Sequence, residues 1–188
     1  MALHAHTGRT GAGSRSPARV RLRPTMTSDL PFVLSLEQDP ENLPFITPWQ
    51  RTQHDAAVRF PDFRHFIIEA GADLQAAGFL ILIGCRGQNG SVELKRMVVR
   101  DKGQGHGRAA LRVAKKVVFD DLVGHRFWLH AKVHGERARA LYESEGFVLE
   151  GTLRDAVRVD AGFESLLVMS MLDIEYAERR RRALELPA

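Results

Sequence analysis

The chain has 188 residues, of which 44% are hydrophobic and 27% are charged, an ordinary composition for one globular domain with a sizeable core. No apolar run approaches the ~20 residues that a helix needs to cross a membrane, and the sequence starts without a secretion signal, so we expect no membrane partner. Cys85 is the single cysteine, which excludes an internal disulfide and favours a cytoplasmic protein.

The formal net charge of +4 is concentrated at the two ends of the chain. Residues 1–23 contain five arginines and no acid, and residues 175–188 contain four arginines and three glutamates. Subtracting these contributions of +5 and +1 leaves a net charge of −2 for residues 24–174. Charged termini are usually solvated, so we expect no nucleic-acid partner. The alternative, an arginine-tailed nucleic-acid binder, would bind with a steep dependence on salt.

Composition divides the chain into three parts. Residues 1–19 are rich in Gly, Ser, Ala, Thr and Arg, and we predict a disordered basic extension. Residues 20–174 are predicted to form a single domain, and residues 175–188 a charged helical tail.

The N-terminal part of this domain is predicted to contain a strand and two helices. Residues 20–23 alternate in polarity as a strand does, and Thr27-Ser28-Asp29 is typical of a helix N-cap before an apolar segment. A second helix is predicted over residues 52–60, with Thr52 as its N-cap. Between the helices, residues 39–50 form a loop with three prolines and two aromatic residues. Such a loop either shapes a binding pocket or buries its own aromatic side chains over the core, and the sequence leaves both alternatives open.

The rest of the domain alternates apolar runs with turn residues. Together with the first elements, the order is strand, two helices, three strands, helix, strand, helix and two strands. This order predicts an α+β fold with a mixed sheet layered with helices. The later strands are expected at residues 64–70, 76–84, 91–99, 127–133, 147–157 and 163–172, and a helix at residues 136–145 that ends at Gly146.

A glycine-rich turn inside Leu94–Asp120 joins an apolar strand to a helix. Glycine adopts positive φ and lets a ligand approach the backbone closely. The first N–H groups of the helix have no intrahelical partner, and with the helix dipole they favour an anion. We therefore predict a phosphate or pyrophosphate site here. The turn glycines are Gly103, Gly105 and Gly107, and the cationic side chains expected around the site are Lys102, Arg108 and Arg112.

Two common phosphate motifs do not account for this turn. A P-loop requires Gly-Lys-Ser/Thr, whereas Gly107 is followed by Arg108-Ala109. The dinucleotide motif is matched formally by residues 105–110, but it also requires an acid at the end of the next strand, where this sequence has Lys132-Val133-His134.

Three motifs together resemble the GNAT acetyltransferase superfamily. Residues 102–109 resemble its pyrophosphate loop, and residues 138–147 resemble its signature Ala-x-x-Leu-Tyr-x-x-x-Gly-Phe. Residues 150–154, followed by Met169, are similar to the branch that holds ribosomal-protein alanine and spermidine acetyltransferases. The resemblance covers about residues 20–172. It implies a mixed, mostly antiparallel twisted sheet of about seven strands, and direct transfer of an acetyl group from acetyl-CoA to a small-molecule or peptide amine within a ternary complex.

The resemblance also implies the site residues. Tyr142 is the expected general acid, the alternative being a core tyrosine, and Glu93 is the expected general base, the alternative being an ion-pair partner. Glu41, Phe45 and Trp49 are expected to contact the acceptor, and no histidine spacing predicts a metal. The residues expected to bind acetyl-CoA are Met97, Val98, Val99, Lys102, Gly103, Gln104, Gly105, His106, Gly107, Arg108 and Ala109.

Two positions depart from the family pattern. Lys102 stands where Gln or Arg is usual, and Gly135 stands where Asn is usual, which removes a contact to the cofactor arm or the substrate. A non-catalytic acyl-CoA sensor is therefore the alternative function. The family often forms homodimers, and the sequence decides neither the assembly nor the acceptor.

Overall fold

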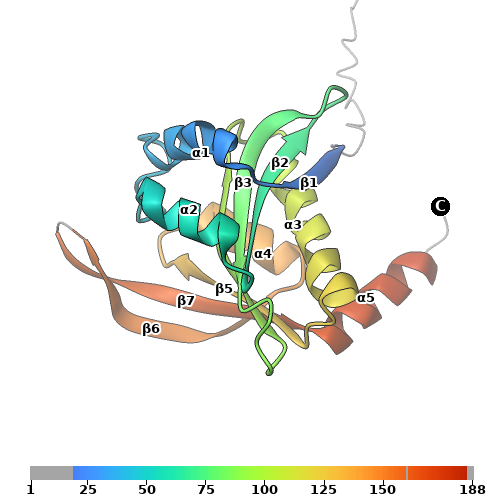
Figure 1. Cartoon of the computed structure of the whole chain (residues 1–188). Coiled ribbons are helices and arrows are strands. Elements are labelled where there is room, and N and C mark those ends of the chain that lie inside the picture. The colour runs from blue at the N-terminus through green and yellow to red at the C-terminus, as the bar shows by residue number, and fades with distance from the viewer. Residues whose placement is uncertain (1–18, 160, 186–188) are drawn as a thin grey trace, which may run out of the picture.

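The computed structural model describes residues 19–159 and 161–185, so the predicted disordered extension lies, apart from Arg19, outside the described residues. Figure 1 shows a central sheet with helices on both faces. Its strands are β1 (Val20–Pro24), β2 (Phe63–Ala70), β3 (Gln75–Ile83), β4 (Ser91–Val99), β5 (Arg126–Lys132), β6 (Val148–Val159) and β7 (Gly162–Leu172). The helices are the 3-10 turn η1 (Thr27–Asp29), α1 (Leu30–Glu37), α2 (Arg51–Arg59), α3 (His106–Lys116) with the π-helical turn η2 (Val117–Asp121), α4 (Glu136–Ser144) and α5 (Asp173–Glu185).

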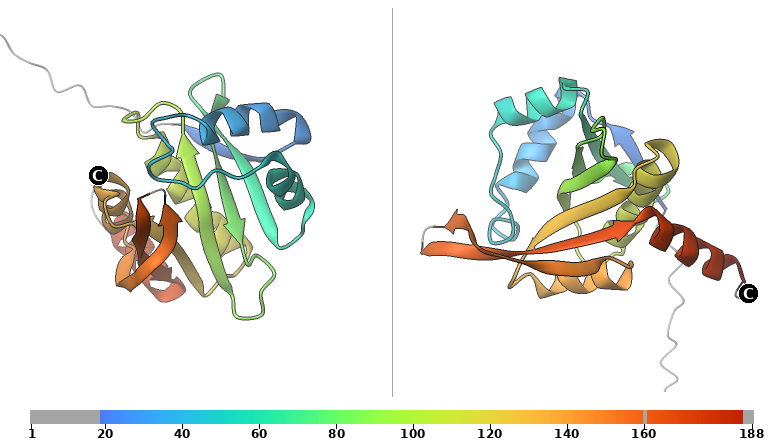
Figure 2. Two further views of the ribbon diagram at one scale, coloured as in Figure 1. Left: turned by 90° about the vertical axis from the view of Figure 1, so that its left-hand side faces the viewer. Right: turned by 90° about the horizontal axis from the view of Figure 1, so that it is seen from below.

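The seven strands form one sheet in the order β1-β2-β3-β4-β5-β7-β6. Strands β4 and β5 are parallel, and every other neighbouring pair is antiparallel. The predicted fold class and the predicted order of the elements are therefore confirmed. Figure 2 shows that the long β6–β7 hairpin extends away from the other strands. None of the helices in the described part of the chain is long and apolar enough to cross a bilayer.

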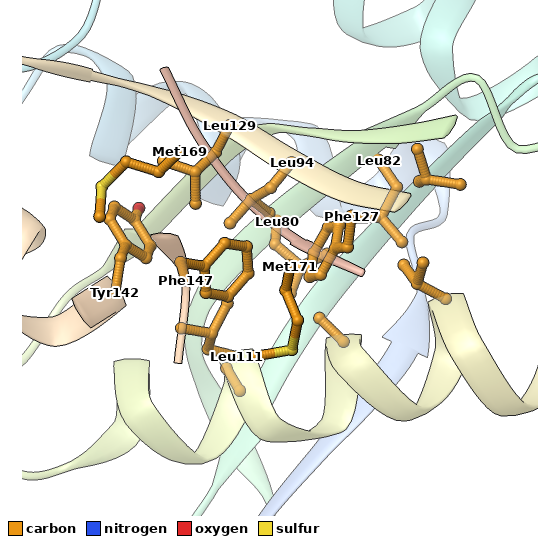
Figure 3. Close-up of a cluster of buried hydrophobic side chains, with 14 of the residues drawn as sticks. Leu80, Leu82, Leu94, Leu111, Phe127, Leu129, Tyr142, Phe147, Met169 and Met171 are labelled. Carbon is orange, nitrogen blue, oxygen red and sulfur yellow. The ribbon is translucent and has the colours of Figure 1, made fainter. Parts of the chain in front are cut away.

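Alternation along β2 and β3 builds a separate core on each face of the sheet. Ile67, Phe79 and Ile81 face α1 and pack against its residues Leu30, Val33 and Leu36. Their neighbours in sequence face α3 and α4. This larger core, part of which Figure 3 shows, includes Phe66, Ile68, Leu80, Leu82, Leu111, Phe127, Tyr142, Phe147 and Met169.

Strand β4 contains a one-residue bulge at Lys95, because Ile81 of β3 pairs with Arg96 while Leu82 pairs with Leu94. One extra residue reverses the faces of all residues that follow it. Before the bulge, the even-numbered Leu94 belongs to the core under α3. After it, the even-numbered Arg96 and Val98 face α1 instead.

Strands β4 and β5 are paired only over their first halves. The parallel ladder begins at Ser91–Arg126 and ends at Leu94–Leu129, directly before the bulge. The second half of β4 is paired with β3 alone, so its backbone groups on the β5 side are left open. This separation of the two central strands produces the cavity described below.

Several predicted boundaries differ from the observed ones by one or two residues, and two of these differences have a clear physical reason. Helix α2 begins one residue before Thr52, and its N-cap is Gln50, whose N–H donates to Gln53 Oε1 at 2.8 Å. Thr52 therefore lies inside the first turn and caps nothing. Strand β6 begins at Val148, because the N–H of Phe147 still donates to the carbonyl of Tyr142 at 3.0 Å and continues the end of α4.

Ion pairs of Glu145, at the C-terminal end of α4, join this helix to α3. Its side chain is 4% exposed and accepts hydrogen bonds from Arg108 and Lys115 at 2.8 and 2.9 Å and from Arg112 Nε at 3.0 Å. Burial alone would raise the pKa of Glu145, but hydrogen bonds from these three cations outweigh it and hold the pKa at about 2.

These ion pairs of Glu145 predict that the free energy of unfolding decreases in acid. The pKa of Glu145 lies below its unfolded value, so its contribution is complete above about pH 4.5 and is lost as the pH falls toward about 2. The contribution is roughly 3 kcal/mol. The free energy of unfolding in urea can be measured for both proteins at pH 6 and pH 3. At pH 6 the Glu145→Gln variant should be less stable than the parent protein. Between pH 6 and pH 3 the free energy of unfolding should fall less for the variant than for the parent protein. Glu143→Gln, which removes only an exposed pair with Arg139, is the matched control. Equal acid sensitivity of the parent and Glu145→Gln would contradict the assignment.

Candidate active site

A cavity of about 580 Å³ lies where β4 and β5 separate. This volume is within the range of small-molecule sites. The 39–50 loop and α2 close it on one face of the sheet, and α4 closes it on the other, so the cavity passes between the two strands. Residues from β4, from the end of β5 and from the β6–β7 hairpin complete its wall.

The glycine-rich turn leads from the end of β4 into α3 with the geometry of an anion site. Gly103 and Gly105 have φ values of +83° and +80°, a backbone conformation that residues other than glycine rarely adopt. Gly105 is the N-cap of α3, and the N–H of Ala109 is the first to close the helix, donating to the carbonyl of Gly105 at 3.0 Å. The N–H groups of residues 106–108 precede that bond and are directed out of the helix end. These donors fit the pyrophosphate of an acyl-CoA.

The cationic side chains predicted around this turn are engaged elsewhere. Lys102 Nζ donates to Glu41 Oε2 at 2.9 Å, which ties the turn to the 39–50 loop. Arg108 and Arg112 bind Glu145. In this structure Arg108 and Arg112 therefore neutralise a buried carboxylate between two helices, and Lys102 neutralises an exposed carboxylate of the 39–50 loop. The anion-site geometry of the turn therefore comes from its backbone N–H groups.

Tyr142 of α4 lines the cavity and is 9% exposed. Its ring lies at the edge of the core, 5.8 Å from the ring of Phe147 (Figure 3). Burial raises the pKa of its hydroxyl to about 12, so the group carries its proton at neutral pH. Both sequence alternatives describe part of what is found: the ring belongs to the core, and the residue faces the cavity.

Glu93 of β4 also lines the cavity, on the opposite sheet face from Val92 and Leu94, which lie in the α3 core. Its side chain is 15% exposed, and Oε1 lies 3.4 Å from Lys95 Nζ and 3.7 Å from His130 Nδ1. Burial lowers the pKa of His130, so this imidazole is neutral near pH 7 and adds no positive charge beside Glu93. Glu93 therefore combines a place in the cavity with an ion pair.

The 39–50 loop both shapes the cavity and buries aromatic surface. Phe45 and Trp49 line the cavity, and Trp49 also packs against the core under α1. The Phe45 ring contacts His134 at 5.7 Å between centroids. Glu41 is not part of the wall: its side chain is 75% exposed and pairs with Lys102.

A buried ion pair that the sequence analysis did not identify anchors this loop. Glu37, at the end of α1, is fully buried and accepts hydrogen bonds from Arg96 and from the N–H of Trp49, the latter at 2.9 Å. Arg96 also donates to the carbonyl of Thr47 at 2.8 Å, and its guanidinium lies 5.4 Å from the Trp49 ring centroid. A sequence signal existed, since an acid ends an apolar helix and an arginine interrupts an apolar strand.

A chain of buried polar groups continues from this pair to β1. His54 Nε2 lies 3.5 Å from Glu37 Oε1, His54 Nδ1 lies 3.0 Å from His65 Nε2, and His65 Nδ1 lies 2.9 Å from Thr25 Oγ1. One set of tautomers directs every proton along the chain toward Glu37, while the 3.5 Å separation leaves His54 Nε2 without a hydrogen bond among the described residues. Burial and the neighbouring His54 lower the pKa of His65 to about 4. Burial tends to raise the pKa of Glu37, but His54 and Arg96 hold it below its ordinary value.

A helix start with the geometry of an anion site, beside a cavity lined by a carboxylate and a phenol, favours a group-transfer enzyme. Residues 19–148 match the family model described as the acetyltransferase (GNAT) domain, and the chain belongs to this family. It is therefore an acetyl-CoA-dependent N-acetyltransferase, as the sequence motifs predicted.

Known proteins agree with this family. A spermidine N(1)-acetyltransferase of Vibrio cholerae is 28% identical over 117 residues, which is 62% of this chain and 67% of that protein. The crystal structure of spermidine N-acetyltransferase from Vibrio cholerae in complex with CoA and spermine has a TM-score of 0.76 at 23% identity, covering 84% of this chain and 98% of that chain. A dodecameric structure of spermidine N-acetyltransferase from the same organism has a TM-score of 0.71 at 23% identity, covering 87% and 98%. These structures share the fold.

The buried pair of Glu37 and Arg96 predicts strong energetic coupling. Glu37→Gln leaves an uncompensated guanidinium in the interior and should lower the free energy of unfolding by about 3 kcal/mol or more. The double variant Glu37→Gln/Arg96→Met removes both charges, so its loss should be smaller than the sum of the two single losses. Urea unfolding of the four proteins measures the coupling. Additive losses would show that the two side chains stabilise the loop independently.

Proposed function

We propose that this enzyme transfers the acetyl group directly to a primary amine that binds in the cavity between β4 and β5. The observation that carries the proposal is that one cavity is lined by both Glu93 and Tyr142 and adjoins the second half of β4. Direct transfer requires the donor thioester, the amine and the proton-transfer groups to share one space.

Acetyl-CoA supplies the thioester carbonyl. The N–H groups of Gln104–Ala109 are proposed to hold its pyrophosphate, and the backbone of Met97, Val98 and Val99 its pantetheine arm. This part of β4 lacks a partner strand on the β5 side, so its N–H groups are available to the arm and to the oxyanion.

Tyr142 is proposed to donate its proton to the leaving sulfur. The raised pKa keeps the hydroxyl protonated at neutral pH, and a hydrogen-bond donor aimed at the sulfur stabilises the negative charge that develops there. Glu93 is proposed to accept the proton that the amine loses, directly or through a water.

The relatives suggest further details of acceptor and assembly. The matched structures are described with spermine and as a dodecamer. An amine acceptor and a symmetric assembly, with a homodimer as its simplest form, are therefore proposed for this chain. Exposed apolar side chains on β6, namely Val148, Leu149 and Leu153, give the hairpin a surface for such contacts. We propose a cytoplasmic location on the ground of the single Cys85.

Release of free thiol from acetyl-CoA in the presence of a primary amine tests the function, and Tyr142→Phe tests the general acid. Loss of the hydroxyl should reduce turnover by roughly a hundredfold, with acetyl-CoA affinity unchanged by calorimetry. The control is Tyr176→Phe, whose hydroxyl binds Asp120 outside the cavity. Parent-like turnover in Tyr142→Phe would remove it from the mechanism. Acetyl-CoA binding with no thiol release from the parent protein would instead favour a sensor.

Replacement of Glu93 tests the general base through the pH–rate profile. A general base acts only when it is deprotonated, so turnover that depends on one should fall at acidic pH. Glu93→Gln should lower the rate and flatten this acidic limb. Glu178→Gln, on α5, is the control with an exposed carboxylate. An unchanged profile in Glu93→Gln would exclude this role.

A further inference from the structure

We infer that the acceptor is an amine with a single positive charge and an apolar body, and not a polyamine. This inference rests on the proposed function, because it concerns the acceptor of the same cavity. The supporting observation is that the carboxylates around the cavity form ion pairs with cations of the same chain.

The cavity wall contains one carboxylate, Glu93, and three permanent cations, Lys95, Arg96 and Lys132, among the residues that the structure describes. Glu93 is already paired with Lys95, and its Oε1 also lies 3.7 Å from Nδ1 of the neutral His130. The cavity therefore presents no surplus of negative charge.

Three further acids, two behind the wall and one on the 39–50 loop, are also paired. Glu37 is held by Arg96, and Glu164 lies 2.9 Å from Lys132 Nζ. Glu41 pairs with Lys102 at 2.9 Å. These three carboxylates each have a cationic partner from this chain, and the side chain of Asp39, the other acid of the loop, accepts the N–H of Glu41 at 2.9 Å.

A polyamine would have to displace these cations. Burying an additional ammonium group without a counter-ion is costly, and breaking a partly buried pair leaves the displaced cation uncompensated. The Trp49 face, which could otherwise bind an ammonium group, is already next to the Arg96 guanidinium. A second ammonium group on the ligand is thus disfavoured in two ways: the cations of the wall repel it, and the nearby carboxylates already have cationic partners.

The uncharged part of the wall suits a hydrocarbon or aromatic body. Phe45, Ile46, Met97 and Leu166 line the cavity beside Trp49. Apolar surface of this kind stabilises a ligand in proportion to the area that it removes from water. A monoamine places its nitrogen near Glu93 and its apolar body against this surface.

Two amines with the same five-carbon chain provide the test: pentylamine, with one ammonium group, and 1,5-diaminopentane, with two. Calorimetry on the complex with CoA measures their affinities without chemistry, and thiol release from acetyl-CoA measures kcat/KM. We expect pentylamine to be preferred by about tenfold or more in both, with spermidine weaker still. Equal or tighter binding of the diamine or of spermidine would overturn the inference.

Lys132→Gln provides a second test, because it leaves Glu164 without its partner. This variant should shift the preference toward the diamine by several-fold, whereas Lys116→Gln, on the exposed side of α3, should not shift it. No shift in Lys132→Gln would contradict the pairing argument. If pentylamine binds more tightly but no amine releases thiol, the selectivity of the cavity stands and the proposed transfer fails.

Discussion

The buried ion pair between Glu37 and Arg96 is the interaction on which the wall of the cavity under the 39–50 loop depends. It joins the end of α1 to the central strand β4, and the same two side chains bind the backbone of the 39–50 loop at Trp49 and Thr47. A buried pair gains little free energy over an apolar contact, because both charges lose their hydration. The pair matters here for geometry, because α1, the 39–50 loop and β4 all meet at the carboxylate of Glu37 and its partner. The wall of the cavity therefore has a fixed position relative to β4.

Strand β4 connects the cavity with the glycine-rich turn, so it would support both the proposed donor and the proposed acceptor. Its first half is paired on both sides and is rigid, whereas its second half is paired with β3 alone. The open side faces the cavity and continues into the glycine-rich turn at the start of α3. Because α3 and α4 are locked through Glu145, the helix that carries Tyr142 is fixed relative to the helix that begins at the turn. The geometry of the site is therefore set by contacts outside the cavity.

Local sequence patterns were sufficient for the fold class, the order of the elements and the glycine-rich turn, because periodicity and turn residues act over a few positions. The side-chain pairs were not predictable in the same way. Arg108 and Arg112 were expected around a phosphate and bind Glu145 instead. The pairing of Lys102 with Glu41 and the chain from Glu37 to Thr25 join residues far apart in sequence. Such pairs depend on how the elements pack, and no local pattern in the sequence specifies the bulge at Lys95 that turns Arg96 toward α1.

That bulge has a consequence for how this strand can vary. A single extra residue decides on which face the guanidinium of Arg96 lies, so deleting one position between Glu93 and Met97 would turn it into the apolar layer beneath α3. Substitutions that preserve polarity alter one contact, whereas a change of length exchanges the two faces of the strand. Homologous chains that keep this site should therefore differ freely in many side chains of β4 while keeping its number of residues constant.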